Sequence, residues 1–181
     1  MTKTLPPLFW MCFLLIPLLG FQDPAITQRP WKVERYINKY RYLAVELNQQ
    51  SGIPIAIIFA VAGLESDWGT SELATYSNNH FGIKAKDWEG PSYCKYTYEF
   101  FDGNWLQLME CFRKYTFIKD SYTDFGNFLR TRDNYRLLFY IPQDNLAAWA
   151  WGLWDCKYAT DPEYPDKLLR LIEAYQLDKV N

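Results

Sequence analysis

Histidine is almost absent from this chain of 181 residues, which has one, at His80. A single histidine excludes the multi-histidine sites that hold catalytic zinc, and it leaves one candidate base for a serine or cysteine nucleophile. A basic excess is absent as well, because 19 lysines and arginines face 21 acidic residues and the formal net charge is -2. This balance provides no basic face for nucleic acid and no polybasic patch for a membrane. We expect no nucleic-acid partner, no metal and no other cofactor, and we interpret His80 as a packing or cleft-wall residue.

Aromatic residues, by contrast, are abundant, with 8 Trp, 14 Tyr and 12 Phe, and hydrophobic residues make up 49% of the chain. This composition is typical of a folded globular protein, and the length suits one domain with a sizeable core. An aromatic excess fits sugar-stacking surfaces, but aromatic side chains at helical spacing are more often core residues. We expect a monomer.

The first 22 residues have the pattern of a signal peptide, with Lys3 followed by an apolar run at residues 8–19. Twelve apolar residues are too few to span a bilayer as a helix, so the run predicts an export signal. We expect a signal peptide at 1–22, a linker at 23–30 and a single folded domain at 31–181. The small-residue pattern for cleavage is poor, so an uncleaved N-terminal membrane anchor is the alternative. In either case we expect an exported protein, in the periplasm, in the cell envelope or secreted.

Apolar periodicity predicts helices over most of the domain. Pro54 begins a helix that is apolar on every side up to Leu64 and that closes at Gly69. Asp102-Gly103 lies between two β-prone runs and predicts a hairpin with a two-residue turn. The expected helices cover 31–50, 55–68, 122–130 with a cap from Ser121 and Asp124, 145–154 with a cap from Asp144, and 161–175.

Glu65 follows ten apolar residues, 55–64, that carry no charge and no polar side-chain group. A helix that is apolar on all sides is buried, so Glu65 emerges from the core into whatever space the fold leaves open. Burial raises the pKa of a carboxyl and lets it hold a proton near neutral pH. A general acid for glycosidic cleavage needs this property. The alternative is a helix-end Glu in a surface ion pair.

The stretch LESDWGTSELATYSNNHFGIKA, residues 64–85, resembles the signature of the bacterial glucosaminidases, glycoside hydrolase family 73, which act on peptidoglycan. A second stretch, YATDPEYPDKL at 158–168, resembles another block of that family, and the likeness runs from Trp31 to the C-terminus. It implies an α+β, mostly α, lysozyme-like fold with a small β-hairpin lobe flanking the catalytic cleft. It also implies that Glu65 is the catalytic acid and that Tyr158 faces the cleft and takes part in catalysis.

The resemblance further implies a second carboxylate on the hairpin, and Glu99 stands at the matching position. The family's SNNHFGIK stretch lines the cleft, so Asn79 and Phe81 are candidate substrate-binding residues, together with Trp68 earlier in the block. For Asn79 the alternative is capping of the backbone. Four other acidic residues are alternative candidates for this second carboxylate: Asp87, Glu89, Asp102 and Glu110. Charged residues exposed on a hairpin are ordinarily just solvated.

The expected activity is hydrolysis of the β-1,4 bond between N-acetylglucosamine and N-acetylmuramic acid in peptidoglycan glycan strands, for cell-wall remodelling. Glu65 would protonate the leaving oxygen, while either water activated by Glu99 or the substrate's own acetamido group attacks the sugar. The alternatives are a lytic transglycosylase or a muramidase on the same fold, and a wall-binding or assembly module without catalysis. Glu99 and the second block count against the transglycosylase, and the presence of Glu65 counts against the module.

Three cysteines remain if Cys12 leaves with a signal peptide. Counting outward from a two-residue turn places Cys94 opposite Cys111 on the hairpin, close enough for a disulfide. We therefore predict a bond between Cys94 and Cys111, with Cys156 as a free thiol. The alternative is three reduced cysteines, because a longer turn would shift the register by one and separate the two sulfur atoms.

Overall fold

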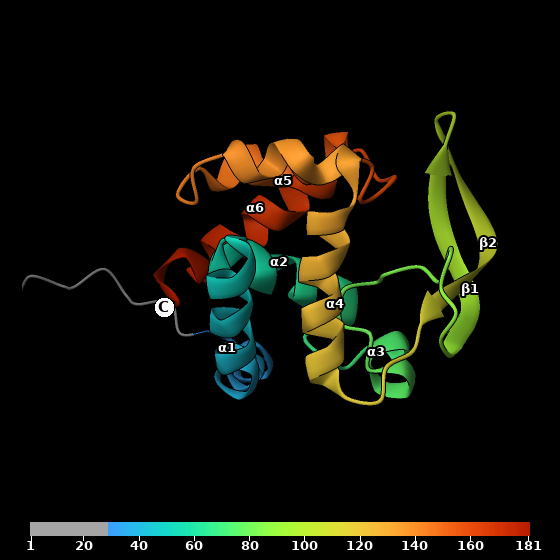
Figure 1. Cartoon of the computed structure of the whole chain (residues 1–181), viewed down its shortest axis with the longest axis horizontal. Coiled ribbons are helices and arrows are strands. Elements are labelled where there is room, and N and C mark those ends of the chain that lie inside the picture. Colours follow the sequence, from blue (N-terminus) through green and yellow to red (C-terminus); the bar gives the residue numbers. More distant parts are fainter. Residues whose placement is uncertain (1–28) are drawn as a thin grey trace, which may run out of the picture.

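The structure is a computed structural model that describes residues 29–181. The predicted signal peptide at 1–22 lies outside the described residues, and so does the predicted linker at 23–30 except for its last two residues. A helical body carries a two-stranded antiparallel hairpin at its side (Figure 1). This mostly α architecture with a small β lobe confirms the predicted fold class. In residues 29–181, no helix combines the length and the apolar character needed to cross a membrane.

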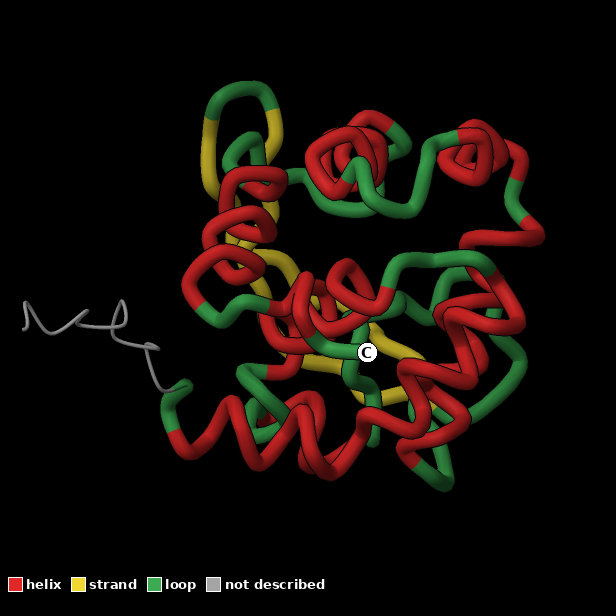
Figure 2. The backbone as a smooth tube through the Cα atoms, turned by 90° about the vertical axis from the view of Figure 1, so that its left-hand side faces the viewer, coloured by secondary structure: helices red, strands yellow, loops and turns green. Residues whose placement is uncertain are grey.

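Helices and short connecting loops make up most of the described chain beside the two strands (Figure 2). The helices are α1 (Trp31–Ser51), α2 (Ile55–Ser66), α3 (Glu72–Ser77), α4 (Ile118–Thr131), α5 (Leu146–Asp155) and α6 (Tyr164–Ala174). Two 3-10 turns, η1 (Asp133–Tyr140) and η2 (Leu177–Lys179), follow α4 and α6. The strands are β1 (Ser92–Phe101) and β2 (Asn104–Arg113).

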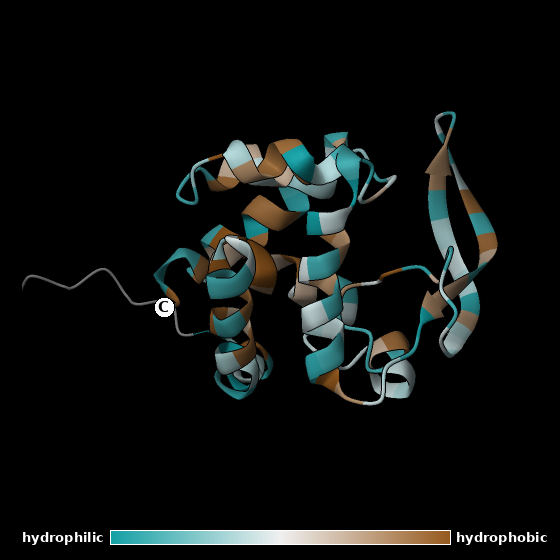
Figure 3. Ribbon diagram, in the orientation of Figure 1, coloured by the Kyte–Doolittle hydropathy of each residue, from teal (hydrophilic) through white to brown (hydrophobic). Residues whose placement is uncertain are grey.

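Helix α2 forms the centre of the helical body. Nine of its twelve residues are buried, and α1, α5 and α6 pack against it. Figure 3 shows the strongly hydrophobic ribbon in this central position, with hydrophilic residues on the outer helices. Full burial of one large apolar side chain contributes about 1.5–3 kcal/mol, so the packing of α2 fixes its position firmly. Glu65 is the next-to-last residue of α2, which confirms the prediction of a buried helix that ends in a carboxylic acid.

The chain leaves α2 through three consecutive residues with positive φ, Asp67 (48°), Trp68 (55°) and Gly69 (80°). The helix therefore ends at Ser66, two residues before its predicted end. Left-handed backbone costs a non-glycine residue about 1–2 kcal/mol, and hydrogen bonds offset this cost. The N–H of Trp68 donates to the carbonyl of Gly63 (3.1 Å), and the N–H of Gly69 donates to the Ser66 hydroxyl (2.8 Å).

Helix α4 begins four residues earlier than predicted. Asp120 caps it by accepting a hydrogen bond from the N–H of Phe117 (3.1 Å). Ser121 and Asp124, the predicted cap, lie inside the helix instead, and the carboxylate of Asp124 accepts two hydrogen bonds from the Arg113 guanidinium (both 2.9 Å). The predicted cap is wrong because Asp124 binds the end of β2 and so joins α4 to the hairpin.

Helices α5 and α6, in contrast to α4, begin later than predicted. Asn145, rather than Asp144, caps α5 by accepting a hydrogen bond from the N–H of Ala148 (3.1 Å). Asp161 accepts a hydrogen bond from the N–H of Glu163 (2.9 Å) and shapes the turn that precedes α6. The predicted helix start at 161 is therefore three residues too early, and residues 158–161 are free to line a cleft as loop.

The hairpin turns at Asp102 and Gly103, whose φ angles of 47° and 81° are both positive. Positive φ at both central residues is the backbone of a two-residue turn of type I′, whose twist matches that of the flanking strands. The register is the one that such a turn predicts, and Cys94 faces Cys111 in it. A disulfide joins these two residues, while Cys156 is a free thiol in this described part of the chain.

Candidate active site

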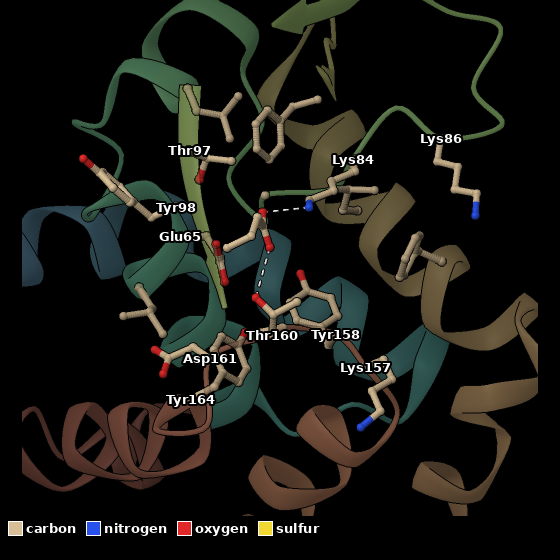
Figure 4. Close-up of a pocket in the computed structure, with 18 of the residues that line it drawn as sticks. Glu65, Lys84, Lys86, Thr97, Tyr98, Lys157, Tyr158, Thr160, Asp161 and Tyr164 are labelled. Atoms are coloured by element: carbon tan, nitrogen blue, oxygen red, sulfur yellow. Dashed lines mark hydrogen bonds and ion pairs between the residues drawn. The ribbon is translucent and has the colours of Figure 1, made fainter. Parts of the chain in front are cut away.

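A cleft of about 720 Å³ lies between the helical body and the hairpin. Its lining comes from the end of α2, the start of α3, the segment 82–87, both strands, the end of α4 with the start of η1, and the loop 157–161 together with the start of α6. Segments far apart in the sequence therefore meet at one place. Figure 4 shows Glu65, Tyr158, Thr160 and Tyr164 around the same part of the cleft.

Glu65 is half-buried in this cleft. Burial raises the pKa of the Glu65 carboxyl to about 7, the neighbouring Tyr164 hydroxyl lowers it, and the negative charge of Glu99 raises it. The Tyr164 hydroxyl is close to the carboxyl, but the two groups do not have the geometry of a hydrogen bond. A carboxyl with this pKa holds a transferable proton near neutral pH, as a general acid must.

Gly82 lies directly against the Glu65 carboxyl. A Cβ atom at this position would stand 2.7 Å from Oε2 of Glu65, closer than real Cβ contacts allow. The φ of Gly82 is 65°, a conformation that also favours glycine. The glycine of the sequence FGIK therefore lets the backbone close over the carboxyl, which removes water from one side of Glu65 and supports its raised pKa.

Glu99 reaches the cleft from β1 and is only 8% exposed. One carboxylate oxygen forms an ion pair with Nζ of Lys84 (2.7 Å), and the other accepts a hydrogen bond from the hydroxyl of Thr160 (3.0 Å). Figure 4 draws both contacts as dashed lines that end at Lys84 and Thr160. A cation and a hydroxyl donor both stabilise negative charge on Glu99.

Lys84 is held at the hairpin by the backbone on either side of it. The N–H of Arg113 donates to the carbonyl of Ile83 (2.9 Å), and the N–H of Ala85 donates to the carbonyl of Cys111 (2.7 Å). Residues 83–85 thus extend the edge of β2, and this places the ammonium group of Lys84 beside the strands.

The other acidic candidates are arranged differently from Glu99. Glu110 also forms an ion pair with Lys84, with 3.2 Å between Oε1 of Glu110 and Nζ of Lys84, but Glu110 is not among the residues that line the cleft. Glu89 and Asp102 also lie outside the cleft lining, whereas Asp87 belongs to it. Among these candidates, Glu99 is the one whose charge acts on Glu65.

Thr160 connects the two lobes of the molecule at Glu99. Its hydroxyl donates to the Glu99 carboxylate, and it accepts a hydrogen bond from the N–H of Phe100 (3.1 Å). Thr160 comes from the loop after α5, so these bonds cross from the helical body to β1. They fix both the position of the strand and the orientation of the carboxylate.

Tyr158 lines the cleft, as the family resemblance implies. Its hydroxyl donates a hydrogen bond to the carbonyl of Phe81 (2.6 Å), which is the residue before Gly82. The hydroxyl proton is therefore committed to the backbone that covers Glu65. Tyr158 is thus joined to the segment that covers Glu65 and also forms part of the cleft wall.

The structure places Asn79 in the core, with no exposed surface. Its side-chain amide donates to the carbonyls of Ile83 (3.0 Å) and Arg113 (2.9 Å), and its oxygen accepts from the N–H groups of Phe81 (3.3 Å) and Ile83 (3.2 Å). Both polar atoms of the amide are occupied by the backbone. We correct the expectation of substrate contact accordingly, because Asn79 shapes the loop that carries Gly82.

Phe81 and Trp68 are also core residues and do not line the cleft. The Phe81 ring is fully buried and stacks on Phe125 at 4.3 Å between ring centroids. The Trp68 ring is 8% exposed and packs on Gly63, where a Cβ atom would stand 2.7 Å from it. Both rings lie in the core and outside the cleft lining, so the expectation of substrate contact needs correction for them as well.

His80 lies in the core beneath the same loop and is 1% exposed. Its Nδ1 forms a hydrogen bond with the hydroxyl of Tyr36 (2.7 Å). Burial lowers the pKa of His80 to about 4, and the charge of Lys39 lowers it further. A neutral, buried imidazole of this kind supports packing.

Most residues of the cleft lining were not among the sequence candidates, and three of them lie beside Glu65 or Glu99: Lys84, Thr160 and Tyr164. All three lie inside the two blocks that resemble the glucosaminidase family, at the ends of FGIK, YAT and DPEY. Their place inside these blocks is the only sequence signal for them. Their partners come from distant segments.

The chain was compared with known proteins. It matches the family Glucosaminidase, described as mannosyl-glycoprotein endo-beta-N-acetylglucosaminidase, over residues 41–177. The exo-glucosaminidase LytG of Bacillus subtilis is 35% identical over 190 residues, which cover 98% of this chain and 66% of LytG. The peptidoglycan hydrolase FlgJ of Escherichia coli is 34% identical over 191 residues, which cover 94% of this chain and 60% of FlgJ. The match covers only 22% of the autolysin of Enterococcus faecalis, so the chain spans a part of the length of these relatives.

Solved structures show the same architecture. A mutant peptidoglycan hydrolase from Sphingomonas sp. A1 superimposes with a TM-score of 0.72 at 29% identity, over 81% of this chain and 96% of that one. The catalytic domain of the autolysin Auto from Listeria monocytogenes gives a TM-score of 0.66 at 31% identity, over 87% of this chain and 92% of that one. These neighbours confirm the lysozyme-like fold. With the family match extending across the cleft from α1 to η2, the chain belongs to the glucosaminidase family of peptidoglycan hydrolases.

Proposed function

We propose that this protein is a glycoside hydrolase that cleaves the β-1,4 bond between N-acetylglucosamine and N-acetylmuramic acid in peptidoglycan. The observation that carries the proposal is the pairing of Glu65, whose pKa is raised to about 7, with Glu99 across one cleft. Glycoside hydrolysis commonly uses two carboxyl groups, one protonated and one charged. The names of the relatives LytG and FlgJ agree with this substrate and reaction.

Glu65 is the proton donor in this proposal. Its proton moves to the glycosidic oxygen as the bond from that oxygen to the anomeric carbon breaks, and Glu65 becomes a carboxylate. Water restores the proton when it adds to the sugar. Catalysis by a positioned general acid contributes typically 10²–10⁴-fold.

Glu99 is the negative partner in this proposal. Lys84 and Thr160 hold both of its oxygens, so its orientation is fixed toward the reacting sugar. The charge acts in two ways, because it favours the protonated form of Glu65 and stabilises positive charge that develops on the sugar ring. Activation of water by Glu99, or attack by the acetamido group of the substrate with Glu99 as an electrostatic aid, both fit this position.

Tyr158 has a positioning role in this proposal. Its hydrogen bond to Phe81 supports the backbone that covers Glu65, and its ring forms part of the wall against which the sugar lies. Substrate contact comes from the exposed faces of the cleft, where Tyr98 and Trp105 of the hairpin supply aromatic surface. Aromatic rings provide a suitable apolar face for a sugar.

The proposed place of action is the cell envelope or the space outside the cytoplasmic membrane, because peptidoglycan lies there. We propose that the protein is exported and acts as a monomer on glycan strands, in cell-wall remodelling. The charge balance of the chain and the position of the whole cleft within one subunit support this part of the proposal.

Product analysis tests the proposed reaction. Purified peptidoglycan is digested with the full-length protein, the products are reduced with borohydride, and their masses are measured. Reduced N-acetylglucosamine ends support the proposal, whereas reduced muramic ends, anhydro-muramic ends or intact glycan would identify a muramidase, a lytic transglycosylase or a binding module. The Glu65→Gln variant, which keeps the shape of the side chain, is the control for contaminating hydrolase.

A further inference from the structure

Tyr164 is the first residue of α6, and its hydroxyl is buried without a hydrogen-bond partner. The residue is 3% exposed. Two other buried side-chain atoms in residues 29–181 lack a partner, Nε of Arg113 and Nε1 of Trp149, and neither residue lines the cleft. Tyr164 does line it. A buried polar group without a partner is costly, so its presence in a cleft calls for a functional explanation.

The hydroxyl faces the acid of the cleft. Helix α6 packs on α2, which carries Glu65, and Tyr164 lies next to Glu65 in the close-up (Figure 4). The proximity has an effect in both directions, because Tyr164 favours the carboxylate form of Glu65 and the charge of Glu65 raises the pKa of Tyr164. Burial, the larger cause, also raises the pKa of Tyr164 well above its usual value, so this hydroxyl keeps its proton.

We propose that Tyr164 is a positioning residue whose hydroxyl donates a hydrogen bond to the carboxylate that Glu65 becomes when it gives up its proton. The inference rests on the proposed function of Glu65 as general acid. While Glu65 is protonated, the Tyr164 hydroxyl is poorly satisfied. Once the proton has moved to the glycosidic oxygen, the hydroxyl gains a charged acceptor, and hydrogen bonds to charged groups are the stronger kind.

Such a hydrogen bond lowers the barrier because it forms as the reaction proceeds. An interaction that is stronger in the transition state than in the ground state accelerates the chemical step, whereas one that is equal in both does not. The Tyr164 proton stays on Tyr164 throughout. The only proton transferred is the one from Glu65 to the leaving oxygen, and the electron pair of the broken bond remains on that oxygen.

Glu65 has other neighbours that influence its ionisation. Glu99 from β1 opposes the carboxylate form, and Lys84 partly balances the charge of Glu99. Tyr158, from the loop after α5, also lies within electrostatic range of Glu65. The remaining charged residues that line the cleft are Lys86, Asp87, Lys95, Arg132, Lys157, Asp161 and Lys167. Of the groups that shift the pKa of Glu65 after burial itself, Tyr164 alone favours the carboxylate.

The Tyr164→Phe variant tests the inference without substrate. In protein labelled with ¹³C at the glutamate carboxyl carbons, the signal of Glu65, assigned with Glu65→Gln, reports its ionisation. The pH at which half of the carboxyl is ionised should move up by about one unit, because one hydrogen bond to the carboxylate is lost. At pH 5, where Glu65 is protonated, the melting temperature should not fall, since the variant then removes a hydroxyl that has no partner.

The same variant has a kinetic signature. On the acidic plateau, near pH 5, kcat should fall by about 3- to 30-fold, because the proton is only partly transferred in the transition state. KM should stay unchanged. The ratio of the kcat of the unmodified protein to the kcat of Tyr164→Phe should become smaller as pH rises. Glu65 loses its proton at lower pH in the unmodified protein than in the variant, so the unmodified protein loses activity first.

Tyr135→Phe is the matched control. Tyr135 is another buried tyrosine of the cleft lining, 3% exposed, that is not among the groups acting on Glu65. The Tyr135→Phe variant should leave the half-ionisation pH of Glu65 unchanged. Incorporation of 3-fluorotyrosine at position 164 is the second test and keeps the shape of the ring, so it remains informative if Tyr164→Phe does not fold. A more acidic hydroxyl is a stronger donor, so the half-ionisation pH of Glu65 should then move down.

Failure of the inference differs from failure of the proposed function. An unchanged Glu65 titration in both Tyr164 variants overturns the inference, even if Glu65→Gln abolishes hydrolysis. A melting temperature that falls in Tyr164→Phe, with the Glu65 titration and the pH profile preserved, also overturns it by showing a structural role. Conversely, absence of hydrolysis by the unmodified protein contradicts the proposed function. The Glu65 titration in the Tyr164 variants then still shows whether Tyr164 donates a hydrogen bond to the Glu65 carboxylate.

Discussion

Gly82 and Glu65 are in contact so close that no side chain fits between them. A Cβ atom at Gly82 would lie 2.7 Å from a carboxylate oxygen of Glu65. The backbone at 82 therefore belongs to the environment of the acid, although glycine brings no chemical group to it. The predictions below begin with this contact.

Gly82→Ala should reduce turnover by about 100-fold or more, because a displaced carboxyl no longer reaches the leaving oxygen. Stability should also fall, by on the order of 1–2 kcal/mol, from the left-handed backbone. Gly103→Ala is the control, since Gly103 has a φ of 81° and no neighbouring atom within 4 Å of the added Cβ. It should lose similar stability and keep its turnover. Equal activity in the two variants would show that the Gly82 contact is irrelevant to catalysis.

Glu65→Gln should abolish hydrolysis and also stabilise the protein at alkaline pH. The folded-state pKa of Glu65, about 7, lies above its ordinary value of 4.5, so the folded protein binds more protons than the unfolded chain between these two values. Stability of the unmodified protein therefore falls as pH rises through that window. At pH 8 the variant should be more stable by on the order of 1–3 kcal/mol, and at pH 4 nearly equal. Thermal unfolding at both pH values provides the measurement, and a constant difference would contradict a raised pKa.

Glu99→Gln and Glu110→Gln separate the two carboxylates that share Lys84. Loss of the Glu99 charge should lower the pKa of Glu65, so the alkaline limb of the pH–rate profile should move to lower pH, and kcat should fall by about 10² or more. Glu110→Gln should leave both properties close to those of the unmodified protein, because Glu110 lies outside the cleft lining. Equal effects of the two variants would mean that Lys84, rather than Glu99, is what the site requires.

Tyr158→Phe should lower both turnover and stability. The lost hydrogen bond to Phe81 leaves a carbonyl without its donor, and such losses cost about 0.5–1.5 kcal/mol. Turnover should fall because the same carbonyl precedes Gly82. Melting temperature and kcat are measured together, and a lower melting temperature with unchanged kcat would restrict Tyr158 to a structural role.

The bond between Cys94 and Cys111 should appear as one crosslinked peptide in non-reducing peptide mapping of the protein. Replacement of both residues by serine should cost about 2–4 kcal/mol of stability. Cys156→Ser serves as the control and should have little effect, since Cys156 takes part in no disulfide. Three alkylatable thiols, or a bridge to Cys156, would contradict the arrangement at the hairpin.

Local patterns were sufficient to predict the elements on which the site is built. Ten apolar residues before Glu65 predict a buried helix, and Asp102-Gly103 predicts the turn, the register and thereby the facing cysteines. These features depend on neighbours in sequence. Helix starts were less predictable, because Asp124 was available either as a cap or as a partner of Arg113, and only the packed structure decides between them.

The site itself required the tertiary structure. Asn79 and Phe81 belong to a block that borders the cleft, and their side chains nevertheless point into the core while the backbone between them and Lys84 faces the acid. A sequence block does not distinguish these two uses of a residue. The contact of Thr160 with Glu99 joins residues 61 positions apart, and no periodicity in the chain indicates it.

The hydroxyl of Thr160 has a mechanical consequence for substrate entry. It bonds the backbone of β1 at Phe100 and the carboxylate of Glu99 at the same time, from a loop of the helical body. Any separation of the hairpin from the body at this point breaks both bonds together. The two lobes therefore cannot part at Thr160 without also releasing one oxygen of the Glu99 carboxylate, while the other oxygen keeps its ion pair with Lys84, which is bound to the hairpin.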